Sequence, residues 1–281
     1  MQEFLEFTLG GISTGMIYAA IALSLVLIWR GTRVLNYSQG AMAMFTTYIA
    51  LIVINHTHSY WLGFVVALAA GLVLGAVIER VVVRPTTRRP PLNAVIVTIG
   101  LLILIEGLAG IIYGGQFRSF PPGYSIRGFN IGHLALGISP EGLYTTIAVL
   151  LAAAALALVF RYTAVGLRLR ATAFNPDVAR LLGVRTGRVL TLGWALAGAF
   201  GALAGVLVSP TTFLYPNSTD LIFVLGFTAA VIGGLVLGVL LNYVSGYLGS
   251  DLVDPAGLVA LVAVLMLRPG GLFSMSTVRR V

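Results

Sequence analysis

Apolar residues fill most of the chain in runs of about twenty, separated by short polar segments, which is the pattern of membrane-spanning helices. A spanning helix needs about 20 apolar residues, because each residue rises about 1.5 Å through a hydrocarbon core about 30 Å thick. The pattern predicts an all-α polytopic membrane protein with a single transmembrane domain over residues 1–281, a bundle of about 7–8 transmembrane helices. The predicted spans are 7–28, 35–54, 60–78, 92–113, 143–160, 190–210, 221–247 and about 252–267.

Composition supports a membrane protein over a soluble one. Hydrophobic residues make up 58% of the chain and charged residues 9%, whereas soluble domains carry about 25% charged residues. A soluble fold of this size could not bury so much apolar surface, but a bilayer solvates it. The net charge of +8 lies in short loops between apolar runs, which favours a role in topology over nucleic-acid binding.

The arginines predict which side of the membrane each loop faces. The chain has no lysine, and 15 of its 17 arginines follow the first, third or fifth span or lie in the C-terminal tail. They are Arg30, Arg33, Arg80, Arg84, Arg88, Arg89, Arg161, Arg168, Arg170, Arg180, Arg185, Arg188, Arg268, Arg279 and Arg280. Because cytoplasmic loops carry the excess of positive charge, we expect 29–34, 79–91, 161–189 and the tail in the cytoplasm, and the N-terminus outside.

The apolar stretch 221–247 does not fit this alternation, because it lies between two arginine-poor loops. At about 1.5 Å per residue it makes about 40 Å of helix, too short to cross a membrane twice. Gly233 and Gly234 near its middle allow a re-entrant pair of half-helices, provided that the irregular backbone is buried against protein. One long span, with Asp251 and Asp254 in the cytoplasm, is the alternative, and the pattern leaves both open.

The sequence contains no constellation for catalysis. There is no cysteine, which excludes disulfides, thiolate metal sites and cysteine nucleophiles. The three histidines leave little for a metal site, and neither a nucleophile elbow nor a phosphate loop is present. The acidic N-terminus lacks the basic region of a cleavable signal peptide. We therefore expect no catalytic residue, no metal ligand and no cofactor bound by this chain.

The basic connection 161–189 contains a good helix start. Asn175 can cap a helix, Pro176 suits its first turn, and Asp177 lies near its positive end. The predicted helix runs over about 177–182 and ends at Gly183. It is either part of a solvated loop whose charges set topology or a docking helix for a cytoplasmic partner. From the residues alone the solvated loop is the simpler interpretation, because topology needs such charges in any case.

Polar residues interrupt two predicted spans. They are Asn36, Ser38, Gln39 and Gly40 at the start of the second span, and Glu106 deep in the fourth. A carboxylate inside a membrane costs about 2.5–3.5 kcal/mol on insertion scales, so these groups should face the bundle interior or a cavity. They either join helices or line a substrate path. For Glu106 a proton relay is disfavoured, because no second ionisable residue is expected inside the spans as its partner.

Small residues line one face of the sixth predicted span. Gly198, Gly201 and Gly205 lie on it, and glycines at such spacing allow close contact between helices. We expect these three residues to serve helix packing within the chain, with a subunit interface as the alternative.

Three segments together resemble the permease subunits of branched-chain amino acid ABC importers, the LivH/LivM family, and its LivH branch in particular. Residues 166–207, "GLRLRATAFNPDVARLLGVRTGRVLTLGWALAGAFGALAGVL", are the most specific part. The segment "RVLNYSQG", 33–40, is similar to the family's Asn-aromatic-small-His/Gln-Gly motif, and "LRPGGLF", 267–273, is similar to its ending. The resemblance covers nearly the whole chain.

The resemblance implies an integral membrane permease subunit of the bacterial plasma (inner) membrane. It would translocate branched-chain amino acids by using ATP hydrolysis in separate subunits, so the chain itself would not be an enzyme. The implied partners are two ABC ATPase subunits that bind ATP and Mg, a second LivM-like permease, an external solute-binding protein and membrane lipid, but no nucleic acid. A permease for urea or short amides, or a stand-alone secondary transporter, is the alternative.

The resemblance also implies roles for residues. By position, the cytoplasmic segment that couples to the ATPase would comprise Arg168, Arg170, Asn175, Pro176, Ala179, Arg180 and Gly183. The chain departs from the family where relatives carry an insertion between "VIGG" and "GGLxLG", since 230–234 here runs straight into 235–238. This departure leaves the geometry of the seventh span, and transport competence, open.

Overall fold

The computed structural model describes residues 2–32, 35–86, 91–131, 134–135 and 138–267 as a bundle of long helices. The long helices are α1 (Gln2–Thr32), α2 (Gln39–Thr57), α3 (Tyr60–Ile78), α4 (Pro91–Tyr113), α5 (Pro140–Tyr162) and α8 (Thr186–Val208). Within the described residues, these six are long and apolar enough to cross a membrane. The expected all-α polytopic membrane protein is therefore confirmed.

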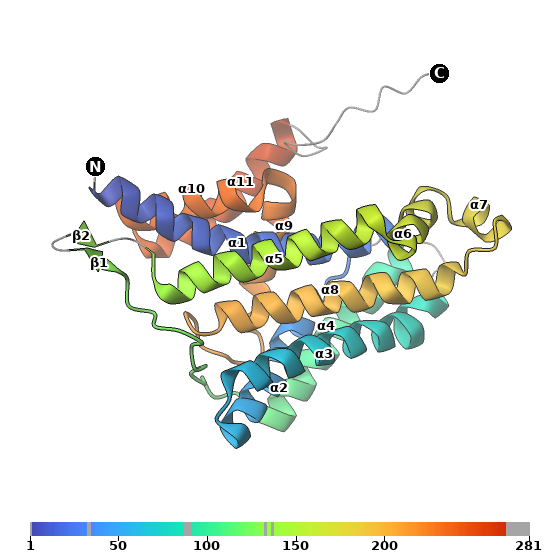
Figure 1. Cartoon of the computed structure of the whole chain (residues 1–281), viewed down its shortest axis with the longest axis horizontal. Helices are drawn as coiled ribbons and strands as arrows, with labels where there is room; N and C mark the ends of the chain where they lie inside the picture. Colours follow the sequence, from blue (N-terminus) through green and yellow to red (C-terminus); the bar gives the residue numbers. More distant parts are fainter. Residues whose placement is uncertain (1, 33–34, 87–90, 132–133, 136–137, 268–281) are drawn as a thin grey trace.

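Shorter elements connect and flank these helices (Figure 1). They are the π-helical turn η1 (Glu79–Val83), the 3-10 turn η2 (Arg84–Thr86), α6 (Ala164–Phe174), α7 (Pro176–Leu181), α9 (Asp220–Ile232), α10 (Gly234–Tyr247), the 3-10 turn η3 (Ser250–Leu252) and α11 (Val253–Leu267). Two short strands, β1 (Asn130–Ile131) and β2 (Leu134–Ala135), pair antiparallel in the loop before α5. The eighth predicted span corresponds to α11, which has 15 residues.

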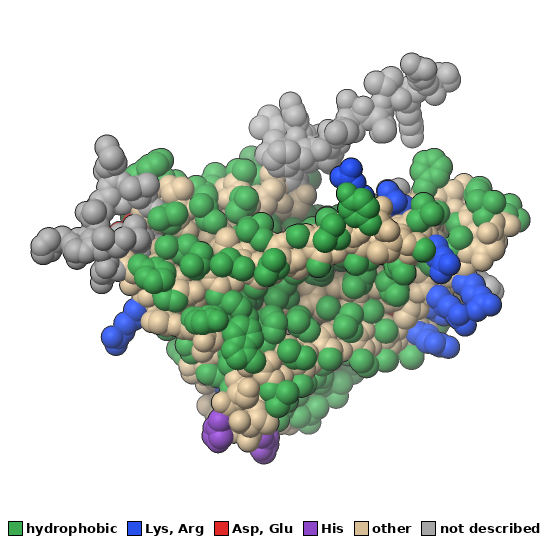
Figure 2. Space-filling view, viewed as in Figure 1, with side chains coloured by type: hydrophobic (Ala, Val, Ile, Leu, Met, Phe, Trp, Pro, Cys, Tyr) green, Lys and Arg blue, Asp and Glu red, His purple; other side chains and the backbone are tan. Residues whose placement is uncertain are grey.

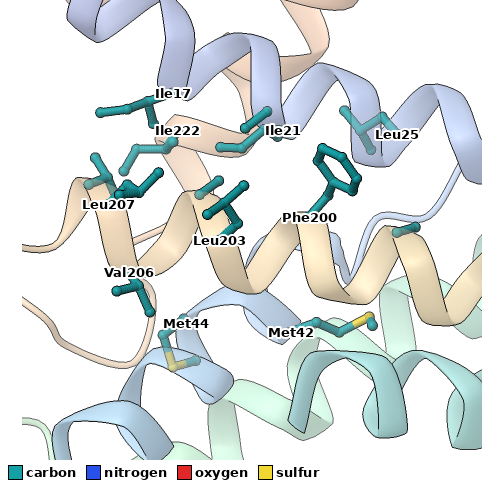
Figure 3. Packing of buried hydrophobic residues seen from close by; sticks show 14 of the residues in the cluster. Ile17, Ile21, Leu25, Met42, Met44, Phe200, Leu203, Val206, Leu207 and Ile222 are labelled. Carbon is teal, nitrogen blue, oxygen red and sulfur yellow. The ribbon is translucent and has the colours of Figure 1, made fainter. Parts of the chain in front are cut away.

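The core of the bundle lies where α1 meets α8. Figure 3 shows Ile17, Ile21 and Leu25 of α1 facing Phe200, Leu203 and Leu207 of α8. All six side chains are buried. The outer sides of α4 and α5 expose many large apolar residues instead, and the space-filling view shows apolar side chains spread over the flank of the bundle (Figure 2). A surface of this kind suits contact with lipid.

Glycines allow α8 to approach its neighbours closely. Gly198 lies against Gly71 of α3, where an added Cβ would meet the Gly71 carbonyl oxygen. On the same helix, Gly201 lies against Gln39 and Gly205 against Thr47, both of α2. Each of the three glycines that we expected to pack helices thus faces another helix of the same chain.

The segment 221–247 is divided into α9 and α10 at Gly233. Gly233 has φ 107° and ψ 125°, a backbone conformation that favours glycine. Helix α9 begins inside the bundle, where Thr219 Oγ1 donates a hydrogen bond of 2.8 Å to the Gly40 carbonyl of α2. Helix α10 then runs along α1 and ends where Tyr247 stacks edge-on with Phe7, near the N-terminus (Figure 1). These two half-helices match the re-entrant alternative, and one continuous span is wrong.

Arginine side chains gather at one end of the bundle, around η1, η2, α6, α7 and the start of α8 (Figure 2). We call this the arginine-rich end. Several expectations lie outside the described residues: Arg33, Arg88, Arg89, the side chain of Arg30, the C-terminal tail 268–281 and nearly all of the motif at 267–273.

Candidate functional site

The arginine-rich end carries two short helices, α6 and α7, outside the long bundle (Figure 1). Helix α7 begins at a cap, because Asn175 Oδ1 accepts hydrogen bonds from the backbone N–H groups of Asp177 and Val178, each 3.1 Å long. It ends at Leu181, and the turn that follows passes through Gly183, whose φ of 82° lies in the left-handed region that favours glycine. The short helix predicted over about 177–182 is therefore confirmed.

Helix α6 was not predicted. Thr163 caps it by accepting a hydrogen bond of 3.1 Å from the Gly166 N–H. A threonine before "AVGLRLRATAF" is a recognisable start signal, but the alternating arginines and apolar residues there suggested only a charged loop. Leu169 on this helix is buried, whereas Arg168 and Arg170 are exposed. On this helix Leu169 therefore packs inward, and the two arginines lie on the outer surface.

The outer surface of α6 and α7 exposes large apolar side chains. Phe174, Leu181 and Leu182 are 93%, 87% and 77% exposed, and Val178 is also exposed. We call these four residues the docking patch. Exposed apolar patches on folded proteins mark surfaces that another protein or a membrane covers. Sequence reasoning selected the neighbouring arginines and missed the patch, although three large apolar residues in a short loop helix are a usable signal.

Arg180 joins α7 to the start of α8 through one hydrogen bond, and it makes a second polar contact within α7. Arg180 Nε donates a hydrogen bond of 2.9 Å to Thr186 Oγ1, and Arg180 Nη1 lies 3.5 Å from Asp177 Oδ1. Ala179 is the buried residue of α7. Of the seven residues that the resemblance placed in a coupling segment, Arg180 and Ala179 thus fix its position, Asn175 and Pro176 start α7, and Gly183 lies in the turn that follows it.

An ion pair between a buried carboxylate and a partly exposed arginine lies between the end of α3 and the start of α8. Glu79 is 1% exposed, and its two carboxylate oxygens accept hydrogen bonds of 3.1 and 2.7 Å from Arg84 Nε and Nη2. Arg84 Nη2 also donates to the Gly187 carbonyl at 2.7 Å, and Thr191 Oγ1 donates to Glu79 Oε2 at 2.7 Å. The sequence assigned Arg84 only to topology, but here it joins two helices.

We expect the Glu79→Ala variant to lose about 2 kcal/mol of unfolding free energy, because it removes the carboxylate that accepts two hydrogen bonds from the partly exposed Arg84. Thermal unfolding of the purified chain in detergent measures the loss. The matched control is Asp177→Ala, which removes the carboxylate of an exposed pair and should cost less than about 0.5 kcal/mol. Equal losses in the two variants would contradict the assignment.

The predicted substrate-path residues at the start of α2 form a hydrogen-bonded cluster inside the bundle. Asn36 Nδ2 donates to Gln39 Oε1 at 3.0 Å, and Ser38 Oγ donates to Asn36 Oδ1 at 2.7 Å. Gln39 Nε2 donates to the Ala197 carbonyl of α8 at 2.9 Å. Gln39 and Gly40 line a cavity of only about 10 Å³ between α1, α2, α8 and α9. In this conformation the cluster joins helices and leaves no room for a solute.

Glu106 does not belong to that cluster. Its carboxyl group interacts with that of Asp220, the first residue of α9. The expectation that no second acid lies near Glu106 is wrong. The re-entrant path of the chain after α8 carries Asp220 into the bundle, and the sequence pattern had placed it in an external loop.

Comparison with known proteins gives a family match over most of the chain. The family described as "Branched-chain amino acid transport system / permease component" matches residues 7–267. The high-affinity branched-chain amino acid transport system permease protein LivH of Escherichia coli is 28% identical over 302 residues, covering 99% of this chain and 98% of that protein. BraD of Pseudomonas aeruginosa, a permease protein of the same description, is 26% identical, covering 100% and 99%. The xylose/arabinose import permease protein XylH of Sulfolobus acidocaldarius is 30% identical, covering 78% and 61%.

The comparison also bears on length. The alignment with E. coli LivH runs over 302 residues, more than the 281 of this chain, so that relative contains residues that this chain lacks. A shortened segment at the junction of α9 and α10 is one expected source of the difference.

Proposed function

The chain belongs to the family of permease components of branched-chain amino acid transport systems, and on this premise we propose that it is the membrane-spanning subunit of an ATP-driven importer of branched-chain or similarly apolar amino acids. Relatives that align along their whole length are named as permeases for these substrates. Another relative is named for the import of xylose and arabinose, so the substrate is the part of the proposal that most needs measurement.

The docking patch is the observation that carries this proposal. A permease that uses ATP from separate subunits needs a rigid surface outside the membrane on which those subunits act. Helix α7 supplies one, because it is capped at both ends and tied to α8 through Arg180 and Thr186. Its apolar side chains would fill a pocket on the ATPase, and the arginines around them would set the orientation.

The same proposal assigns the remaining partners and the orientation. The arginine-rich end faces the cytoplasm of a bacterial cell, where two ATPase subunits hold ATP and Mg. A second LivM-like permease completes the membrane part, and an external solute-binding protein delivers the substrate to the opposite end. The chain itself performs no chemistry on ATP or on the substrate.

Reconstitution tests the proposal. The chain, co-expressed with an ATPase pair, a second permease and a binding protein, should co-purify with the ATPase. In proteoliposomes, leucine should stimulate ATP hydrolysis only when the binding protein is present. Leucine uptake by proteoliposomes that hold this chain alone, driven by a proton gradient, would overturn the proposal in favour of a secondary transporter. Stimulation by urea or xylose in place of leucine would correct the substrate.

A further inference from the structure

A cavity of about 430 Å³, lined by apolar and polar side chains, lies at the end of the bundle opposite the docking patch. Its lining comes from α1, from the start of α5, from the end of α8 and from α9, with Asn242 of α10 and Asp254 of α11. Binding sites for small molecules have volumes of this order and combine an apolar wall with a few polar groups. The cavity therefore has the size and the mixed lining of a ligand site.

Glu141 is the most unusual residue of this lining. It lies in the first turn of α5, which Ser139 caps, and it is 2% exposed. Glu141 Oε2 accepts a hydrogen bond of 2.8 Å from the Tyr124 N–H. Among the residues that the structure describes, Glu141 Oε1 has no hydrogen-bond partner, and neither has Ser13 Oγ on the facing side of α1. Leaving a buried carboxylate oxygen without a hydrogen bond costs free energy. Binding of a hydrogen-bond donor or a cation next to Glu141 Oε1 is therefore favoured.

The charge around the cavity points to the sign of its ligand. The lining includes a second acid, Asp254, and within the described part of the chain it includes no arginine. Hydroxyl and amide groups of Thr145, Thr211 and Asn242 line the same space. Two acids without a neutralising arginine favour a cationic group, and the hydroxyl and amide groups offer donors to an accompanying anion.

The wall of the cavity towards the bundle centre is apolar. Figure 3 shows Ile17 of α1, Leu207 of α8 and Ile222 of α9 pointing toward one another, and all three line the cavity. Ile222 and Val208 also line the small closed cavity that contains Gln39 and Gly40. The apolar wall thus separates the acidic cavity from the hydrogen-bonded cluster on α2.

We propose that this cavity binds the transported apolar amino acid, with its ammonium group at Glu141 and Asp254 and its branched side chain against Ile17, Leu207 and Ile222. The inference rests on the proposed function, which supplies the amino acid, and it adds the residues that select it. Movement of Ile222 and Val208 would open the way to Gln39. The ammonium group supplies the charge that the acidic lining requires.

Equilibrium binding to the full chain in lipid nanodiscs tests the proposal. Radiolabelled leucine is displaced by 3-methylbutylamine, which keeps the ammonium group and the branched chain, and not by 4-methylpentanoate, which lacks the ammonium group. Glu141→Gln should weaken leucine binding at least about tenfold, because the charge is lost while the amide oxygen can still accept from the Tyr124 N–H. The matched control is Glu3→Gln, an exposed acid on α1 outside the cavity, which should bind as the unmodified chain does.

Asp254→Asn is a second variant, used if Glu141→Gln does not yield folded protein, and it should also weaken leucine binding. Leucine binding unchanged in both variants, displacement by 4-methylpentanoate, or no leucine binding by the unmodified chain would overturn the inference. Failure of the proposed function can be distinguished from failure of the cavity assignment. If leucine binding depends on Glu141 but the chain does not associate with an ATPase, the cavity assignment stands without the importer. If Glu141→Gln leaves leucine-stimulated ATP hydrolysis intact, the importer stands without the cavity.

Discussion

Replacing Leu181 with aspartate is expected to weaken association of the chain with the proposed ATPase partner about a hundredfold. Leu181 is exposed at the end of α7, so the substitution disturbs no internal packing and leaves the Asn175 cap and the Gly183 turn in place. In the complex it would put an unpaired charge into an apolar pocket of the partner. Loss of such an interface residue costs about 3 kcal/mol, roughly a hundredfold in affinity. Co-purification of the ATPase and its affinity for the permease in detergent measure the effect.

The control for this prediction makes the same chemical change at the other end of the molecule. Ile126 is an exposed apolar residue in the loop before α5, and Ile126→Asp should leave ATPase association unchanged. Leu181→Met keeps the apolar contact and should retain most of the affinity. If Leu181→Asp binds the ATPase as tightly as the unmodified chain, the docking patch is not the contact surface.

Replacing Gly198 with alanine should destabilise the bundle by about 3 kcal/mol. The added methyl group would meet the backbone carbonyl of Gly71, and a backbone atom cannot turn aside as a flexible side chain can. Helices α3 and α8 must then separate, which loosens the packing around α8. The midpoint of thermal unfolding in detergent, monitored through the fraction of protein that stays monodisperse, measures the loss of stability.

Gly107 provides the matched control, because it is also a helical glycine. On α4 an added Cβ at Gly107 would meet no described atom within 4 Å. Gly107→Ala should therefore leave stability within about 1 kcal/mol of the unmodified chain, since alanine is the better helix former. A comparable loss in both variants would show that helix propensity or insertion, and not the contact with Gly71, sets the effect.

Helix α7 shows what local sequence can specify. Its start needs only a capping side chain followed by proline, and its end needs only a glycine that tolerates positive φ. The six long spans follow in the same way from runs of apolar residues, because the length and hydropathy of a segment are its own properties. These features were predicted correctly within a few residues of their observed ends.

The segment after α8 shows where local pattern is insufficient. The glycine pair in 221–247 allows either a continuous helix or a break, and the contacts of α9 with α2 and of α10 with α1 select the break at Gly233. The same path carries Asp220 from an expected loop to the side of Glu106. Both half-helices pack against α1, so the break between them lies against protein, as irregular backbone at membrane depth requires.

Sequence by itself thus determined the class of the protein, its six long spans, its basic loops and the capped helix α7, because each depends on residues close together in the chain. Only the tertiary structure decided which distant residues share a site. The sequence places the apolar residues of the docking patch in a loop helix, but only the structure shows that Phe174 and Leu181 are exposed. The cavity of Glu141 and Asp254 forms only where six helices meet. Such groupings depend on how helices pack, and packing is decided by contacts between segments that are far apart in the sequence.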